Sequence, residues 1–546
     1  MKTILFRKTV CLITAFLLVL SVFVLSSSAE NSTFYNSIKK IATVDAVDND
    51  ATTYGLEYDY GYPTTVNAVQ NADGTYCICL VMADGSIKIM ELNADFSVRT
   101  TVNVAAQLKF FAAFCKGTDG TYYVLFNQPL TVSTRNQTSL RLVNVGSDSS
   151  VIRTLDMSGM ASGAWLGIGE LNCGNNAMTA NDNYLTGFIG RDMFPVKNKN
   201  EFHEDGEVHQ ASYAFAVDLE SFSLVEGLTS NDIPYASHSF HQTILKDGND
   251  FLYVERCDSM PSRAYVLTKM SGGLEWKKLY QKYSFEFKSK PVPEGTADNN
   301  TYGQLGGVLR CGDKYMLVGT YQNTTEETEQ SSANVFVQLF DRVTLTSQKE
   351  KYLTSYADKP GTGNGINTAA NPKLVKVSDS YVAIPYMLTN YTKNTDEIHV
   401  ILADSSGEML WDKAVEYNSD NPSLPKYGQV FYDSAKDSIV WFTVVNRKLI
   451  ANSIELGVKG ETVTTSAATV TETTTAQEET STETVAATKA ETTTESATVP
   501  VFTTEPVPET ETTTEAQQQV EQEPTFWQKI VNFFMSIYNF FVSLFT

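Results

Sequence analysis

A tight turn centred on an aspartate recurs seven times along this chain, each time just before an apolar, strand-like run. The aspartates stand at positions 73, 119, 182, 247, 313, 379 and 437, at spacings of 46, 63, 65, 66, 66 and 58 residues. Asp-Gly and related turns between apolar runs are strong β-hairpin signals. A repeat of this length, with about four short strands in each unit, is typical of a β-propeller, whose blades bury their faces only against neighbours. The sequence therefore predicts an all-β propeller, with seven blades favoured and six or eight left open because the turns at 182 and 437 are weak signals.

The fourth unit, Lys246 to Tyr280, shows the pattern most clearly. It reads as the strands FLYVERC, AYVLTKM and LEWKKLY, and HSFHQTIL before it supplies a further strand. The seventh unit is one strand short, whereas the strand-like run from Ser37 to Val47 has no hairpin partner nearby. We expect this N-terminal strand to complete the seventh unit and close the ring, because closure removes exposed sheet edges. Two stacked β-sandwiches would fit the strand content but not the recurring turn.

Two units place a tryptophan after a glycine turn. These are LADSSGEMLWDKAVE, with Trp411, and LTKMSGGLEWKKLY, with Trp276. Both resemble the repeat of the quinoprotein-like (PQQ-like) propellers, in which this tryptophan docks between blades; Trp411 matches well and Trp276 loosely. The resemblance covers two of the seven units and implies the fold only. The quinone-dependent members usually need an adjacent Cys-Cys pair, which this chain lacks.

The first 29 residues have the features of a secretory signal peptide. Lys2, Arg7 and Lys8 precede an apolar run from Val10 to Leu25, and Ser27-Ser28-Ala29 offers a small-residue cleavage site. We expect export, cleavage and a propeller domain over residues 30–460; retention of the run as an anchor is the alternative.

Composition changes abruptly after the propeller. Residues 461–525 hold twenty-three Thr and thirteen Glu among sixty-five residues, so they can form no core and are predicted to be a disordered linker or stalk. Residues 526–546 then have helical spacing, with a polar stripe opposite a broad aromatic face that includes Trp527, Phe533, Phe534, Phe540 and Phe541. This short amphipathic helix is predicted to contact a membrane surface or to self-associate; a bilayer span and docking on the propeller are the alternatives. The spacer and helix together resemble the C-termini of some secreted proteins of Gram-positive gut bacteria, which implies a location at the cell surface.

The charge and the cysteine content limit the binding partners and the cysteine chemistry that we expect. The formal net charge is −22, so the surface repels phosphate backbones and nucleic acid is a poor partner. The same argument disfavours strongly anionic polysaccharides unless a local basic patch overrides it. The six cysteines after the signal peptide are sparse, and Cys77 and Cys79 stand two apart in one strand-like run, on one face. Buried thiols are the favoured interpretation, with one or two disulfides as the alternative.

Four of the five histidines fall between His203 and His241, which is the one sharp local signal for chemistry. A turn between His203 and His209 would bring those rings together, while His238 and His241 stand where the fourth unit begins. With Glu204, Glu207 or Asp258 these side chains are candidate ligands for Zn²⁺ or Mn²⁺. The alternative is that these histidines are surface or packing residues with no part in a functional site. Acidic loops could hold Ca²⁺ but lack the EF-hand spacing.

Two functions compete at this level. The first is a secreted, surface-displayed propeller that binds a polysaccharide or a protein partner, for which the abundant Tyr and Phe would supply stacking platforms. The second is a metal-assisted polysaccharide lyase or glycoside hydrolase with a site at His203, His209, His238 and His241. The site is expected at the junction of the third and fourth units.

Overall fold

The computed structural model describes residues 34–47, 64–128, 137–158, 175–192, 210–225, 239–257, 265–270, 281–285, 303–322, 332–357, 366–391, 393–416 and 424–458. All of them belong to the first of two compact units, Met1–Thr464. The predicted signal peptide, the Thr/Glu-rich segment and the C-terminal helix lie outside the described residues. Within the described part, no helix has the length and apolarity needed to cross a membrane.

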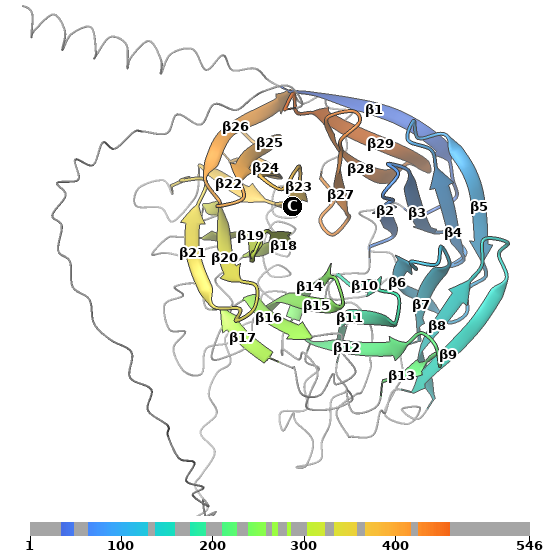
Figure 1. Cartoon of the computed structure of the whole chain (residues 1–546). Coiled ribbons are helices and arrows are strands. Elements are labelled where there is room, and N and C mark those ends of the chain that lie inside the picture. Colours follow the sequence, from blue (N-terminus) through green and yellow to red (C-terminus); the bar gives the residue numbers. More distant parts are fainter. Residues whose placement is uncertain are drawn as a thin grey trace, which may run out of the picture. The chain divides into compact units, whose positions relative to one another are not determined.

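The described residues form a seven-bladed, all-β propeller (Figure 1). The strands of the first three blades are β2 (Val66–Gln70), β3 (Tyr76–Val81), β4 (Ile87–Leu92) and β5 (Val98–Val104); β6 (Phe110–Lys116), β7 (Tyr122–Asn127), β8 (Thr138–Val145) and β9 (Val151–Ser158); β10 (Ala177–Ala180), β11 (Tyr184–Asp192), β12 (Gln210–Asp218) and β13 (Ser223–Leu224). Blades 4 and 5 contain β14 (Ser239–Asp247), β15 (Asp250–Cys257), β16 (Tyr265–Met270) and β17 (Gln281–Phe285); β18 (Gln304–Cys311), β19 (Lys314–Gln322), β20 (Ala333–Asp341) and β21 (Ser347–Tyr352). Blade 6 contains β22 (Asn367–Ala370), β23 (Val375–Lys376), β24 (Tyr381–Asn390), β25 (Thr395–Asp404) and β26 (Met409–Glu416), and blade 7 contains β27 (Val430–Asp433), β28 (Ser438–Val445), β29 (Lys448–Glu455) and β1 (Phe34–Thr43). The prediction of the fold is confirmed.

The recurring aspartate turn joins the inner strand of a blade to its second strand. In blade 1, Asp73 accepts hydrogen bonds from the backbone nitrogen and the hydroxyl of Thr75, at 3.0 and 2.6 Å. Gly74 between them has φ +79°, a left-handed conformation that glycine adopts without strain. Asp119 holds Thr121 in the same way before β7. These local bonds explain why the turn is readable in the sequence.

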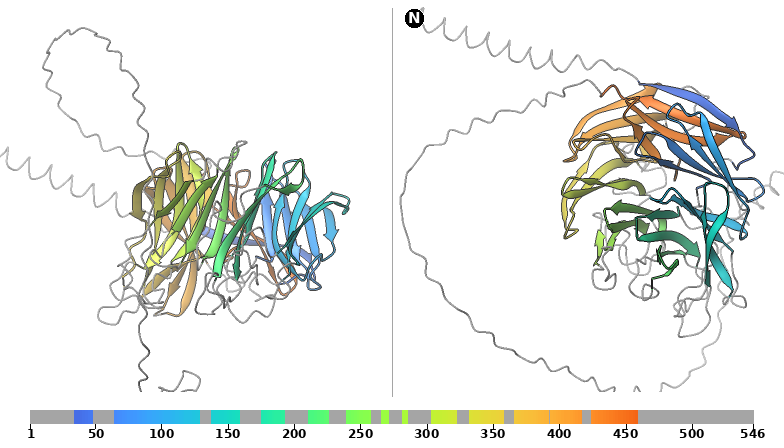
Figure 2. Two further views of the ribbon diagram at one scale, coloured as in Figure 1. Left: turned by 90° about the horizontal axis from the view of Figure 1, so that it is seen from below. Right: turned by 45° about the vertical axis from the view of Figure 1, so that its right-hand side comes forward.

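The ring closes through β1, as predicted. This strand pairs antiparallel with β29 from Asn36 opposite Ile454 to Thr43 opposite Lys448. Its first residues also pair parallel with β26 of blade 6, at Phe34 opposite Val415. One N-terminal strand therefore connects blade 7 to blade 6 (Figure 2).

The blades pack through apolar clusters, each shared by two neighbours. Cys77 and Cys79 face blade 2 from blade 1 in one such cluster, and both are buried free thiols, as are Cys115 and Cys311. Trp411 packs against the cluster between blades 6 and 7. Trp276 and Cys173 lie outside the described residues.

The outer strand of blade 4 is later than expected. We expected LEWKKLY, from Leu274, but the strand that pairs with β16 is Gln281–Phe285, with Gln281 opposite Lys269. An outermost strand has a single neighbour and buries little, so its register is weakly specified by the sequence.

Candidate functional site: the central cavity

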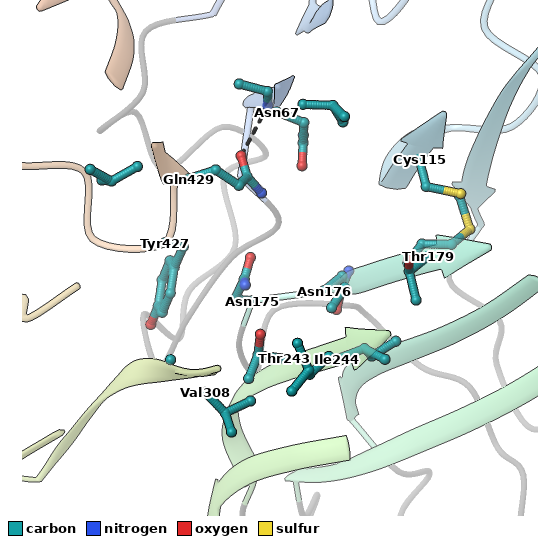
Figure 3. Close-up of a pocket in the computed structure, with 18 of the residues that line it drawn as sticks. Asn67, Cys115, Asn175, Asn176, Thr179, Thr243, Ile244, Val308, Tyr427 and Gln429 are labelled. Atoms are coloured by element: carbon teal, nitrogen blue, oxygen red, sulfur yellow. Dashed lines mark hydrogen bonds between the residues drawn. The ribbon is translucent and has the colours of Figure 1, made fainter. Parts of the chain in front are cut away.

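The inner strands of the blades surround a cavity of about 530 Å³ on the propeller axis. Its wall comes from β2, β6, β10, β14, β18 and β27 and from the segment between β22 and β23 (Figures 1 and 3). This volume lies within the range of about 300–1,000 Å³ that is typical of small-molecule sites.

Lys373 reaches the cavity because the inner strand of blade 6 is interrupted. Residues 371–374 separate β22 from β23, and both strands pair with β24. Pro385 of β24 lies opposite the interruption, and its carbonyl accepts a 2.9 Å hydrogen bond from the backbone nitrogen of Lys373. Proline has no amide hydrogen for a ladder, so strand interruptions and bulges accommodate it.

Blade 5 makes room for this segment with two glycines. A Cβ on Gly306 would lie 3.0 Å from the carbonyl oxygen of Pro372, and Gly307 has φ +130°. The carbonyl of Gly306 accepts a 3.1 Å bond from the backbone nitrogen of Leu374. The glycine pair therefore allows blade 6 to bring Lys373 close to the axis.

The Lys373 side chain is buried, with 7% of its surface exposed, although it lines the cavity. Its ammonium donates a 2.8 Å hydrogen bond to the carbonyl of Lys426. Burial disfavours the charged form and lowers the pKa of Lys373 to about 7. An anion in the cavity would favour the charged form and raise that pKa again.

His241, in β14, lies on the same wall and makes an edge-on contact with Tyr427, with ring centroids 5.1 Å apart. Burial, and then the charges of Lys373, Arg256 and Lys426, hold the pKa of His241 well below its usual value. The imidazole is therefore neutral at pH 7 and offers one donor and one acceptor nitrogen.

Side-chain amides also line the cavity (Figure 3). Asn176 is satisfied by structure alone, because it donates to the carbonyl of Ala112 at 3.0 Å and accepts from the Gly190 nitrogen at 2.9 Å. Gln429 accepts a 3.0 Å bond from the Ala68 nitrogen through Oε1, which leaves its NH₂ group turned toward the cavity in Figure 3. Asn175 donates to the carbonyl of Gln242 at 3.3 Å, while its buried Oδ1 has no hydrogen-bond partner among the described residues.

The charge of the cavity wall is opposite in sign to that of the whole chain. Its lining includes Lys116, Lys246 and Lys373, and no Asp or Glu is among the described residues that line it. The Lys116 ammonium is paired with Glu91 at 2.8 Å, and Lys246 is an exposed residue near the end of β14. Lys373 is thus the buried cationic group of the cavity.

The structure describes one member of the predicted histidine site. His241 lines the cavity, and the expectation that it stands at the start of the fourth unit agrees with its place in β14. His203, His209, His238, Glu204 and Asp258 lie outside the described residues, as do Trp527, Phe533, Phe534, Phe540 and Phe541. Among the residues that are described, no group of three or more His, Cys, Asp and Glu side chains is arranged to hold a metal ion.

Lys373, Asn175 and Tyr427 were not among the site residues predicted from the sequence. Two signals pointed toward Lys373: a proline inside the apolar run YVAIPYML and a Gly-Gly pair in the strand before blade 5's turn. A proline in an apparent inner-sheet strand predicts an interruption in its neighbour. No comparable pattern marks Asn175 or Tyr427, which lie in connections before the inner strands.

Comparisons with known proteins give similarity at the level of structure. No family model and no curated protein sequence matches the chain. Among solved structures, the chain is similar to an ulvan lyase of a polysaccharide lyase family, with 10% identity, 76% of this chain and 94% of that chain covered, and a TM-score of 0.40. It is also similar to the extracellular domains 1-2 of Drosophila Semaphorin 1b (9% identity, 76% and 88% covered, TM-score 0.37). A third similar structure is a mutant of Synechocystis apocarotenoid oxygenase (9% identity, 65% and 72% covered, TM-score 0.34).

Proposed function

We propose that this protein is an exported, surface-associated propeller that binds a carbohydrate in its central cavity. The observation that carries the proposal is the cavity wall, to which the amides of Asn175 and Gln429 contribute together with His241 and Tyr427. Amides pair well with sugar hydroxyls, and the Asn175 oxygen lacks a partner among the described residues. Aromatic rings with a polar edge, such as Tyr427, suit the mixed polarity of a sugar ring.

The sequence features outside the described residues support a role at the cell surface. A signal-peptide pattern precedes β1, and the Thr/Glu-rich segment and aromatic helix would hold the propeller away from a membrane or in a self-associated form. Kinship to quinoprotein-like propellers is part of the same proposal, supported by the match around Trp411 and its place at the cluster between blades 6 and 7.

A glycan array probed with the mature full-length protein tests the proposal. Hits are then measured by calorimetry with Asn175→Ala and Tyr427→Ala, and with Tyr391→Ala as a control on an exposed residue at 42% exposure. We expect the two cavity variants to weaken binding at least tenfold and the control to match wild type. Binding that survives both cavity variants, or binding only to protein partners, would contradict a carbohydrate site in the cavity.

An enzyme is the second candidate, because neutral His241 and Lys373 share the cavity wall. A neutral imidazole can accept a proton from a bound sugar, and a cation can stabilise the charge that develops. The metal-assisted version adds Zn²⁺ or Mn²⁺ at the predicted histidine site. Metal analysis of purified protein and chromatography of array hits after incubation distinguish the two. Intact oligosaccharides together with the absence of stoichiometric metal would contradict an enzymatic function.

A further inference from the structure

We infer that the ligand of the central cavity is an acidic sugar, which places a singly charged anionic substituent, a carboxylate or a sulfate ester, against Lys373. This inference rests on the proposed function, because it names the ligand class of the same cavity.

The sign of the charge at the cavity favours an anion. The chain carries a net charge of −22, yet the described residues of the cavity wall include three lysines and no carboxylate. Lys116 is paired with Glu91, whereas Lys246 and Lys373 form no ion pair among the described residues. A low-dielectric pocket lined by one sign of charge concentrates ligands of the opposite sign. A neutral sugar requires no such arrangement.

The Lys373 ammonium is buried beside a single described acceptor. Lysine is almost never fully buried unless it is paired, and the described partner of this ammonium is a single backbone carbonyl, that of Lys426, at 2.8 Å. An ammonium has three donors. A carboxylate or sulfate oxygen within the cavity would satisfy the donors that remain, through a charge-assisted hydrogen bond.

The local structure around Lys373 brings one cation to the cavity. It combines three features: Pro385, the interruption between β22 and β23, and the pair Gly306-Gly307. An unbroken inner strand would have satisfied the fold with less burial of charge. The interruption between β22 and β23 therefore serves the cavity and is not needed to form the blade.

The remaining wall favours one anionic charge on a sugar over a more highly charged ligand. Besides Lys373, the cavity is lined by the neutral His241, Tyr427 and the amides of Asn175 and Gln429, whereas the cations Arg256 and Lys426, whose charges act on His241, are not among its described lining residues. A phosphate ester carries up to two charges and is recognised by several cations together. The neutral groups instead match the hydroxyls of a sugar that carries the anionic substituent.

Calorimetry with three matched oligosaccharides tests the inference on the mature full-length protein. The probes are a uronate oligomer, the same oligomer with its carboxyls reduced to alcohols, and a sulfated neutral oligomer. We expect the uronate or the sulfated probe to bind at least about tenfold more tightly than the reduced one. Lys373→Met should remove this preference, and Lys376→Met is the matched control, because Lys376 is exposed and paired with Asp379 at 2.7 Å.

A second variant keeps the test independent of how Lys373→Met folds. Asn175→Asp adds a negative charge to the cavity wall and should weaken the acidic probe at least tenfold more than the reduced probe. Equal binding of acidic and reduced probes, unchanged by Lys373→Met, would overturn the acidic-sugar inference and leave carbohydrate binding in place. Tighter binding of inorganic phosphate than of either acidic probe would also overturn it. Failure of every carbohydrate to bind would instead remove the proposed function itself.

Discussion

The backbone nitrogen of Lys373 lies 2.9 Å from the carbonyl oxygen of Pro385, at the point where the inner strand of blade 6 is interrupted. Pro385 is in β24, whereas Lys373 lies in the segment between β22 and β23, both of which pair with β24, and the missing amide hydrogen of Pro385 faces this interruption. The proline therefore removes a bond that would otherwise hold the inner strand straight.

Pro385→Val supplies that missing donor and should allow the inner strand to pair more regularly, which draws Lys373 back from the axis. We expect the affinity for an acidic probe to fall by roughly threefold to tenfold, while the propeller stays folded, because valine favours strands. Calorimetry measures the affinity, and circular dichroism checks the fold. An unchanged affinity would show that the interruption of the inner strand does not depend on the proline.

Ligand affinity should depend on pH through Lys373. The pKa of this residue is about 7 without ligand, and a bound anion raises it. Affinity for the acidic probe should thus be nearly constant below about pH 6 and fall as the pH rises through 7. Lys373→Arg, which stays charged, should flatten this profile. The other groups around the site are His241, already neutral at pH 7, and the cations Arg256 and Lys426. If the affinity of Lys373→Arg still falls with rising pH, the pH dependence comes from a group other than Lys373.

Lys373→Met should stabilise the free protein at neutral pH. Because the pKa of Lys373 is lower in the folded state than in the unfolded state, the unfolded chain binds more protons between pH 7 and about 10. The free energy of unfolding of wild type therefore rises with pH across this window, and the variant should lose that slope. At pH 7 we expect a gain on the order of 1 kcal/mol, reduced by loss of the bond to Lys426. Urea unfolding at pH 7 and pH 9.5 measures both quantities, and a destabilised variant at pH 7 would contradict the prediction.

Tyr315→Phe should weaken the junction between blades 4 and 5. The Tyr315 hydroxyl donates a 2.8 Å hydrogen bond to Asp247, which also forms ion pairs with Arg310 and Arg342. Loss of a bond to a charged acceptor costs about 1.5–3 kcal/mol. Tyr381→Phe is the control, since Tyr381 follows the equivalent turn in blade 6 but its hydroxyl has no hydrogen bond among the described residues. Equal thermal midpoints for the two variants would contradict a role for the Tyr315 bond.

Deletion of residues 30–43 should destabilise the whole ring. This segment contains β1, whose removal exposes the edge of β29 in blade 7 and ends the pairing with β26 in blade 6. We expect a lower thermal midpoint and association of the truncated chains in size-exclusion chromatography. A truncated protein that melts like wild type would show that the seventh blade is stable without its N-terminal strand.

The sequence by itself predicted the repeated hairpin unit, a ring with seven blades favoured over six or eight, and closure of the ring through the N-terminal strand. The hairpin turns depend on local chemistry, such as the side chain of Asp73 bonded to Thr75 and a glycine at positive φ. They can therefore be recognised within a few residues of sequence. The closing strand was predictable because the seventh unit lacked one strand and the N-terminus held a spare one.

Only the tertiary structure decided the cavity. His241, Lys373 and Tyr427 are separated by 132 and 54 positions in the chain, and they meet because seven inner strands converge on one axis. The neutrality of His241 and the lowered pKa of Lys373 likewise result from burial by other blades, which no local pattern encodes. The turns can be predicted from neighbouring residues in the sequence, whereas the properties of the central cavity come from contacts between residues that are far apart in the chain.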